Sequence, residues 1–194
     1  MKSRKFGSFF LKLLLPILVL AVFGFLFMNR NSEPELPIRE YFPIAEFYPG
    51  SNSEHPDAKA KTKVRVYLPG TKAVFYTFRG PKINEYAAIW IDGYALTAPN
   101  EFFAKVAFPM VLAIKKFGVT SRGGWSLEAR ESPVELGDRE KIFRIMSNGG
   151  EIGTLITAQR GHVVYSYRLL GAELEGVQPW QTGILSRILL IESL

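Results

Sequence analysis

The sequence predicts an α+β domain, namely an antiparallel sheet of hairpins with one long helix and one C-terminal helix, preceded by a single transmembrane helix. Three observations support this prediction: an apolar run near the N-terminus, strand-like alternation between Gly- and Pro-containing turns, and two segments with apolar residues at helical spacing. We divide the chain into a basic cytoplasmic tail (1–8), a transmembrane anchor (9–28), a proline-rich linker (29–58) and an exported domain (59–194).

The predicted anchor runs from Phe9 to Met28 and contains one charged residue, Lys12. Its length of about 20 residues matches the ~30 Å hydrocarbon core of a bilayer. Residues 1–8 hold three basic residues, so the positive-inside rule predicts a cytoplasmic N-terminus and a single-pass protein of the cell membrane with its domain outside the cytoplasm. A cleaved signal peptide is the alternative, but residues 27–30 lack a small-x-small cleavage pattern.

The charge balance argues against a nucleic-acid partner. The formal net charge is +6, but residues 1–30 hold five basic residues and no acidic ones. Removing these five from 24 leaves 19 basic against 18 acidic residues, a net charge of only +1 for residues 31–194. The chain has no cysteine, which excludes disulfides, thiol catalysis and zinc–thiolate sites.

The segment from Asn31 to Asp57 is predicted to be a linker, because its five prolines disfavour both helices and central strands. Its middle, from Ile38 to Tyr48, is rich in aromatic residues. We expect this part to lie along the surface of the domain, since so much apolar area is costly to leave in water. A docking segment for a partner is the alternative.

A first hairpin is predicted at the start of the exported domain. Apolar and polar residues alternate from Val64 to Leu68, a turn follows at 69–72, and a return strand covers 73–78. The strand pattern therefore begins soon after Lys59.

A second hairpin is predicted around the pair Asp92-Gly93. Such pairs favour two-residue hairpin loops because both positions tolerate a positive φ. The flanking strands are expected at 86–91 and 94–97.

Residues 57–82 hold seven basic residues and one acidic residue, Asp57. One interpretation is that lysines on an exposed edge strand prevent edge-to-edge pairing. The other is contact with anionic headgroups, an acidic polymer or a partner. The residues predicted to make such a contact are Lys59, Lys61, Lys63 and Lys72.

A long helix is predicted to begin after the N-cap Asn100 and to close near Gly118. Its length of about 17 residues and the internal Lys105 argue against a second membrane span. We expect one face to pack on the sheet; a lipid- or ligand-binding stripe is the alternative. This face comprises Phe103, Val106, Ala107, Met110, Val111 and Ile114.

The remaining signals predict a meander of four strands, near 125–129, 142–146, 152–158 and 163–170, and a closing helix from Trp180 to about Ile191. The expected core collects apolar residues from all these elements: Val64, Val66, Phe75, Trp90, Phe103, Met110, Val111, Trp125, Leu155, Val164 and Leu185.

No catalytic, metal-binding or cofactor signature is present. The two histidines, His55 and His162, lack metal-ligand spacing. A hydrolytic triad would need His162 with Ser126 or Ser166, but no G-x-S-x-G elbow occurs. Two carboxylate pairs have the residue types for acid–base chemistry. They are Glu173 with Glu175 and Glu128 with Glu131.

One family resemblance follows from the order of elements. Gly124-Trp125 opens a strand, a hairpin follows, and the strand Val163–Gly171 leads to the closing helix. Over about residues 60–191 this arrangement resembles the exported domain of exosortase-associated proteins, which are membrane-anchored accessories of bacterial exopolysaccharide and protein-sorting systems. That family has a cysteine before the Gly-Trp pair, whereas this chain reads Val119–Gly123 there, so any role of that cysteine is not carried over.

We therefore expect a membrane-anchored, non-enzymatic accessory that binds a partner, most simply a membrane protein, in an exosortase-type system of the envelope. The alternative is a hydrolase-like envelope enzyme using carboxylates or His162. The two differ in whether a deep pocket converges on those groups.

Overall fold

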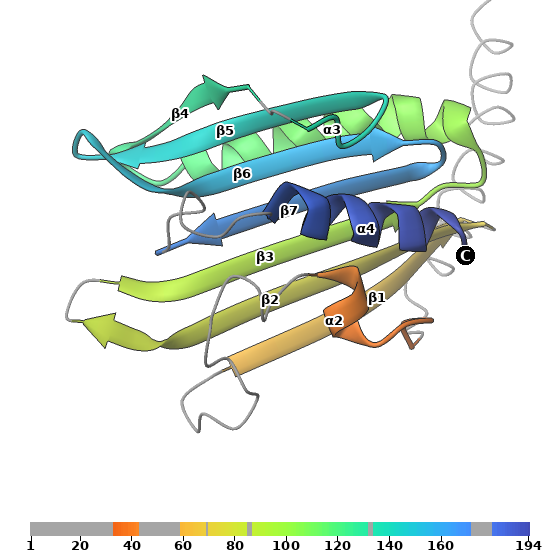
Figure 1. Cartoon of the computed structure of the whole chain (residues 1–194), viewed down its shortest axis with the longest axis horizontal. Coiled ribbons are helices and arrows are strands. Elements are labelled where there is room, and N and C mark those ends of the chain that lie inside the picture. The colour runs from red at the N-terminus through yellow and green to blue at the C-terminus, as the bar shows by residue number, and fades with distance from the viewer. Residues whose placement is uncertain (1–32, 43–58, 69, 85–86, 132–133, 172–179) are drawn as a thin grey trace, which may run out of the picture.

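The computed structural model describes residues 33–42, 59–68, 70–84, 87–131, 134–171 and 180–194 (Figure 1). The predicted tail and anchor lie outside these residues, as do His55, Glu173 and Glu175. No helix within the described ranges combines the length and hydropathy needed to cross a membrane.

The domain is built on one antiparallel sheet of seven strands in the order β1-β2-β3-β7-β6-β5-β4 (Figure 1). Both β1 and β4 are edge strands. The strands are β1 (Lys59–Leu68), β2 (Thr71–Asn84), β3 (Ala87–Thr97), β4 (Trp125–Arg130), β5 (Arg139–Ser147), β6 (Gly150–Arg160) and β7 (Val163–Leu170). The predicted meander from β4 to β7 is confirmed, with β7 closing against β3.

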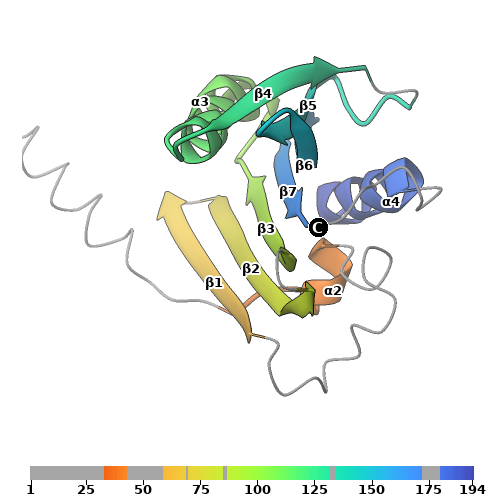
Figure 2. The ribbon, with the colours of Figure 1, turned by 90° about the vertical axis from the view of Figure 1, so that its left-hand side faces the viewer.

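Helices cover both sides of this sheet (Figure 2). Helix α3 (Glu101–Thr120) lies on one side, while α2 (Ile38–Tyr41) and α4 (Trp180–Glu192) lie on the other. The larger hydrophobic cluster forms beneath α2 and α4, and two smaller clusters form beneath α3. The predicted α+β class is thus confirmed for the described residues.

The first predicted hairpin is confirmed, with Gly70 at φ 78° in the turn between β1 and β2. The second predicted turn is wrong, because β3 runs without interruption through Asp92-Gly93. Gly93 serves a different purpose there. A Cβ at this position would lie 2.4 Å from Cδ1 of Phe42, so glycine allows the aromatic ring to lie on the strand.

The segment before β1 belongs to the core, and the prediction that it only lines the surface is wrong for its described part. Tyr41 and Phe42 are 2% and 0% exposed. The Phe42 ring stacks on Tyr76 with centroids 5.7 Å apart, and it packs at 5.6 Å against Tyr165. The Tyr165 hydroxyl donates to the carbonyl oxygen of Tyr41 at 3.0 Å. The prolines around Ile38 did not prevent the short helix α2.

Helix α3 begins as predicted, since Asn100 Oδ1 accepts from the Phe103 amide at 3.1 Å. It ends at Thr120, two residues beyond the predicted glycine. The predicted buried face is largely wrong: Phe103 and Met110 are 48% and 62% exposed. The side chains that do pack against the sheet are Ala104, Phe108, Val111 and Val119. Apolar residues occur around most of this helix, so spacing alone did not select the face that the sheet covers.

The other core predictions divide into two groups. Four of the predicted core residues are buried: Val64, Val111, Leu155 and Val164. Five are half-buried: Val66, and four that pack against the clusters, namely Phe75, Trp90, Trp125 and Leu185.

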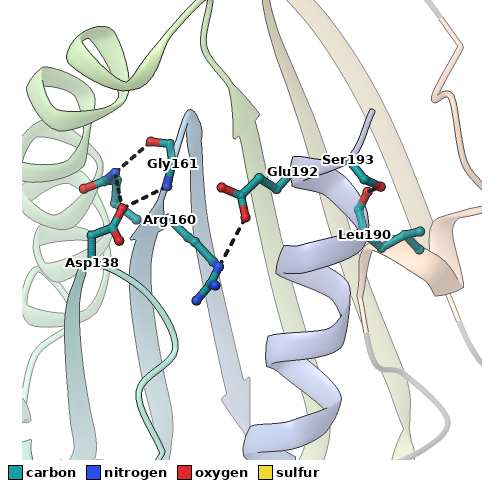
Figure 3. A network of polar contacts seen from close by, with 7 residues as sticks. Asp138, Arg160, Gly161, Leu190, Glu192 and Ser193 are labelled. Atoms are coloured by element: carbon teal, nitrogen blue, oxygen red, sulfur yellow. Dashed lines mark hydrogen bonds and ion pairs between the residues drawn. The ribbon is translucent and has the colours of Figure 1, made fainter.

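The closing helix α4 is confirmed, and polar contacts hold its end to the turn between β6 and β7 (Figure 3). Arg160 Nε donates to Glu192 Oε2 at 3.2 Å, and the Gly161 amide donates to Asp138 Oδ2 at 2.9 Å. Gly161 has φ 50°, and a Cβ there would lie 2.1 Å from Glu192 Oε1. This turn therefore favours glycine for its backbone angle, and a larger residue would also displace the Glu192 carboxylate.

Candidate anion-binding face

The side of the sheet that faces α3 is rich in cations. Residues opposite each other in an antiparallel register share one side of the sheet, and so do alternate residues of a strand. By this rule Lys61, Lys63 and Arg65 of β1 lie on the same side as Arg79 of β2 and Arg168 of β7. We call these five residues the basic face. Within the described strands β1, β2, β3 and β7, Asp92 is the single carboxylate.

An open groove of about 660 Å³ runs beside the β1 cations, and Phe75 and Thr77 of β2 form part of its lining. Arg65 Cζ lies 5.7 Å from the centroid of the Phe75 ring. That ring meets Tyr94 edge-on at 5.0 Å, and Tyr94 packs in the same cluster as Phe108 of α3. The groove therefore lies on the edge formed by β1 and β2, and the Phe75–Tyr94 contact connects its lining to the cluster beneath α3.

Trp90 lies at the centre of three guanidinium groups. The Cζ atoms of Arg79, Arg122 and Arg168 are 4.4, 4.3 and 5.4 Å from its ring centroid. In such contacts the negative face of the aromatic ring attracts the positive charge of the guanidinium group. Asp92 accepts from Trp90 Nε1 at 3.0 Å and forms an ion pair with Arg168. Asp92 thus pairs with one of the three guanidinium groups around Trp90.

Arg168 is held in place from α3 as well. Its Nη1 donates to the Gly118 carbonyl at 3.3 Å, near the C-terminal end of α3, where the helix dipole favours positive charge. Burial lowers the pKa of Arg168, but the Asp92 partner and the helix end stabilise its charged form. This side chain is therefore a fixed charge behind the more exposed lysines of β1.

Lys115 of α3 adds a nearly buried amine to this side. Its Nζ lies 5.0 Å from the Tyr94 ring centroid. Burial lowers the pKa of Lys115 to about 8 and raises the pKa of the Tyr94 hydroxyl well above its ordinary value. The cation–π contact offsets only part of the cost of removing the ammonium from water.

The low pKa of Lys115 predicts a pH-dependent stability. Between about pH 8 and pH 10.5 the unfolded chain keeps a proton that the folded chain has lost, so the free energy of unfolding should rise with pH in this window. Lys115→Met should remove that rise. Urea unfolding of both proteins at several pH values between these limits measures the difference, and equal slopes would show that Lys115 does not titrate as its burial implies.

The four lysines predicted to contact an anionic partner separate in the structure. Lys61 and Lys63 lie together and exposed on the basic face. Lys72 lies on the other side of the sheet, since it is opposite Val66, and its Nζ is 2.8 Å from Glu35 Oε1. The backbone of Lys59 is opposite Arg79 at the end of β1, but its side chain lies outside the described side chains.

Sequence reasoning missed the other cations of this side. Arg65 belongs to the same alternating run as the lysines, so strand periodicity alone could have placed it on the same side of β1. Arg79, Arg122 and Arg168 come together only because β3 pairs with β2 on one side and with β7 on the other, and because the chain leaves the end of α3 beside Trp90. No short motif contains them.

The structure separates the residues considered for catalysis. Ser166 is 1% exposed, and its hydroxyl donates to the Ile156 carbonyl at 3.0 Å. His162 lies in the turn before β7, four positions away, which is about 13 Å along an extended chain. Ser126, Glu128 and Glu131 are exposed on and just after β4. Among the described residues no group of three or more acidic or histidine side chains has the arrangement of a metal site.

This arrangement is suited to binding an anion and brings together no acid, base and nucleophile among the described residues. Fixed guanidinium groups, exposed lysines and aromatic rings line one concave side. No family model, curated protein or solved structure matches the chain.

Proposed function

We propose that this chain is a membrane-tethered, exported accessory protein that holds an extended anionic partner on its basic face. The observation that carries the proposal is the charge of one sheet side, where five cations lie on β1, β2 and β7 and the four strands β1, β2, β3 and β7 contribute one carboxylate. The predicted anchor and the resemblance to exosortase-associated proteins support a role beside an envelope sorting or exopolysaccharide system.

The spacing on β1 favours an extended partner over a small ion. Lys61, Lys63 and Arg65 alternate along one strand, so neighbouring cations are about 6.6 Å apart and the row is about 13 Å long. Repeating carboxylates or phosphates on a chain can meet such a row at several points. Separate, exposed contacts of this kind are individually weak, so several are needed for useful affinity.

The proposal predicts that charge reversal on β1 weakens binding to a polyanion. The full chain in neutral-lipid nanodiscs would be titrated with fluorescent polyglutamate and, separately, with an acidic polysaccharide, and binding followed by anisotropy. Lys61→Glu combined with Lys63→Glu should weaken binding at least tenfold at low salt, because attraction at two points becomes repulsion. Raising the salt to about 1 M should weaken wild-type binding, since the Debye length falls to ~3 Å.

A matched control keeps the same change in net charge. Arg39→Glu with Lys141→Glu reverses two exposed cations that do not line the groove: Arg39 lies on α2, and Lys141 lies on β5, which four strands separate from β1. This control should bind polyanions nearly as the wild type does. Equal losses in both double variants would mean that net charge alone governs binding and would reject the basic face as the site.

The accessory role also predicts indifference to the residues considered for catalysis. His162→Gln, and Glu128→Ala with Glu131→Ala, should leave polyanion binding and the cellular role intact. Loss of the cellular role in these variants, with folding and binding unchanged, would favour the envelope enzyme instead.

A further inference from the structure

The outer surface of α3 is apolar along most of its length. Six large side chains there are between 48% and 71% exposed. At 3.6 residues per turn they fall within an arc of about 120°, over about 22 Å of helix. A continuous exposed surface of this kind marks an interaction site. We call it the apolar stripe: Phe102, Phe103, Val106, Met110, Ile114 and Phe117.

Two lysines of α3 border the apolar stripe on one flank, and the basic face lies beyond the other flank. Lys105 and Lys116 lie on the flank toward β5, where Lys116 Nζ is 5.0 Å from the Phe143 ring centroid. The other flank faces β3 and β1, and the basic face lies beyond it on the same side of the sheet (Figure 2). Glu101, the one acidic residue of α3, pairs with Lys105.

We propose that α3 lies on an anionic bilayer, with the apolar stripe at the boundary between headgroups and acyl chains. A helix with an apolar face bordered by lysines has the chemistry of an interfacial helix. Each basic group near an anionic leaflet adds to the attraction. Phenylalanine, methionine and isoleucine side chains supply the apolar area that enters the boundary.

The same observations disfavour a second copy as the occupant. Two stripes packed on each other would bring the flanking cations of one copy close to those of the other, and like charges across an interface oppose association. The bilayer is also within reach. The sequence predicts an anchor at 9–28 and the described part of the domain begins at Glu33, so the connecting chain from Met28 to Glu33 spans at most about 18 Å and keeps the domain beside the bilayer.

This inference goes beyond the proposed function, because α3 can lie on lipid whether or not the basic face holds an anionic chain. The two are measured separately, one by lipid quenching and the other by binding of soluble polyglutamate.

The absence of cysteine makes the test direct, because one introduced cysteine carries one label. The full chain with Met110→Cys or Phe117→Cys, bearing an environment-sensitive fluorophore, would be reconstituted into vesicles of phosphatidylglycerol and phosphatidylcholine. Ser186→Cys, exposed on α4 at the other side of the sheet, is the matched control. Acyl chains carrying bromine should quench both α3 labels strongly and the α4 label little.

Two further measurements sharpen the result. Val106→Asp with Ile114→Asp should abolish quenching at position 117 while leaving the unfolding midpoint unchanged, because both positions are exposed. Quenching should also weaken in vesicles of phosphatidylcholine alone. Equal quenching of the α3 and α4 labels would overturn the proposal. Shielding of the α3 labels that increases with protein concentration, without quenching by lipid, would also overturn it, because that result indicates a second copy on the apolar stripe.

Discussion

Phe42→Ala is expected to lower the free energy of unfolding by about 3–5 kcal/mol, the range for truncating a buried phenylalanine. Phe42 is 0% exposed and packs against Tyr76 and Tyr165, although it precedes the first residue of β1 by 17 positions. Chemical denaturation of the full chain measures the loss. A loss below about 1 kcal/mol would mean that this segment is detachable from the domain.

The contact between Phe42 and Gly93 gives a second measurement of the same packing. Gly93→Ala alone should destabilise by about 1–3 kcal/mol, because the added methyl overlaps the ring. In the Phe42→Ala background this cost should largely disappear, since the ring is gone. Gly118→Ala is the control, because a Cβ there meets nothing closer than Arg168 Nη1 at 3.9 Å, and alanine favours a helix. Additive losses for Phe42 and Gly93 would contradict the contact.

Two phenylalanines of α3 are expected to differ sharply. Phe108→Ala should cost about 3–5 kcal/mol, because this side chain is 7% exposed against the sheet. Phe103→Ala should cost less than about 1 kcal/mol, because Phe103 is 48% exposed on the outer side of the helix. The comparison keeps residue type and helix constant, so it isolates burial.

The opposite order would mean that α3 is rotated about its axis, with the apolar stripe against the sheet. The prediction that Phe103 belongs to the core would then be restored, and the inference about the bilayer would lose its surface. Denaturation curves of the two alanine variants therefore test the orientation of α3 without any ligand or lipid.

The edge position of β1 bears on both interpretations of its lysines. Edge strands expose unpaired backbone groups, and charged side chains discourage pairing with another sheet. That explanation accounts for Lys61 and Lys63 on β1. It does not account for Arg79, Arg122 and Arg168 around Trp90, which lie on or next to inner elements. The cations on this side of the sheet extend beyond what edge protection requires.

The amino-acid sequence by itself determined the class of the fold and most of its elements. Alternation predicted the meander from β4 to β7, because a half-buried strand repeats every two residues. The start of α3 followed from Asn100, since an N-cap acts through bonds to its own first turn. These features depend on neighbours a few positions apart, so they can be predicted before any distant contact is known.

Only the tertiary structure decided which surfaces meet. Asp92-Gly93 is a residue pair typical of turns, but here it lies within a strand, where the missing Cβ of Gly93 leaves room for the ring of Phe42. Helix α3 is apolar on most of its circumference, so packing on Tyr94, Leu96 and Val164 chose the buried side and left the apolar stripe outside. The basic face likewise joins residues more than a hundred positions apart. Contacts between distant segments made these choices, and local sequence patterns carry no record of them.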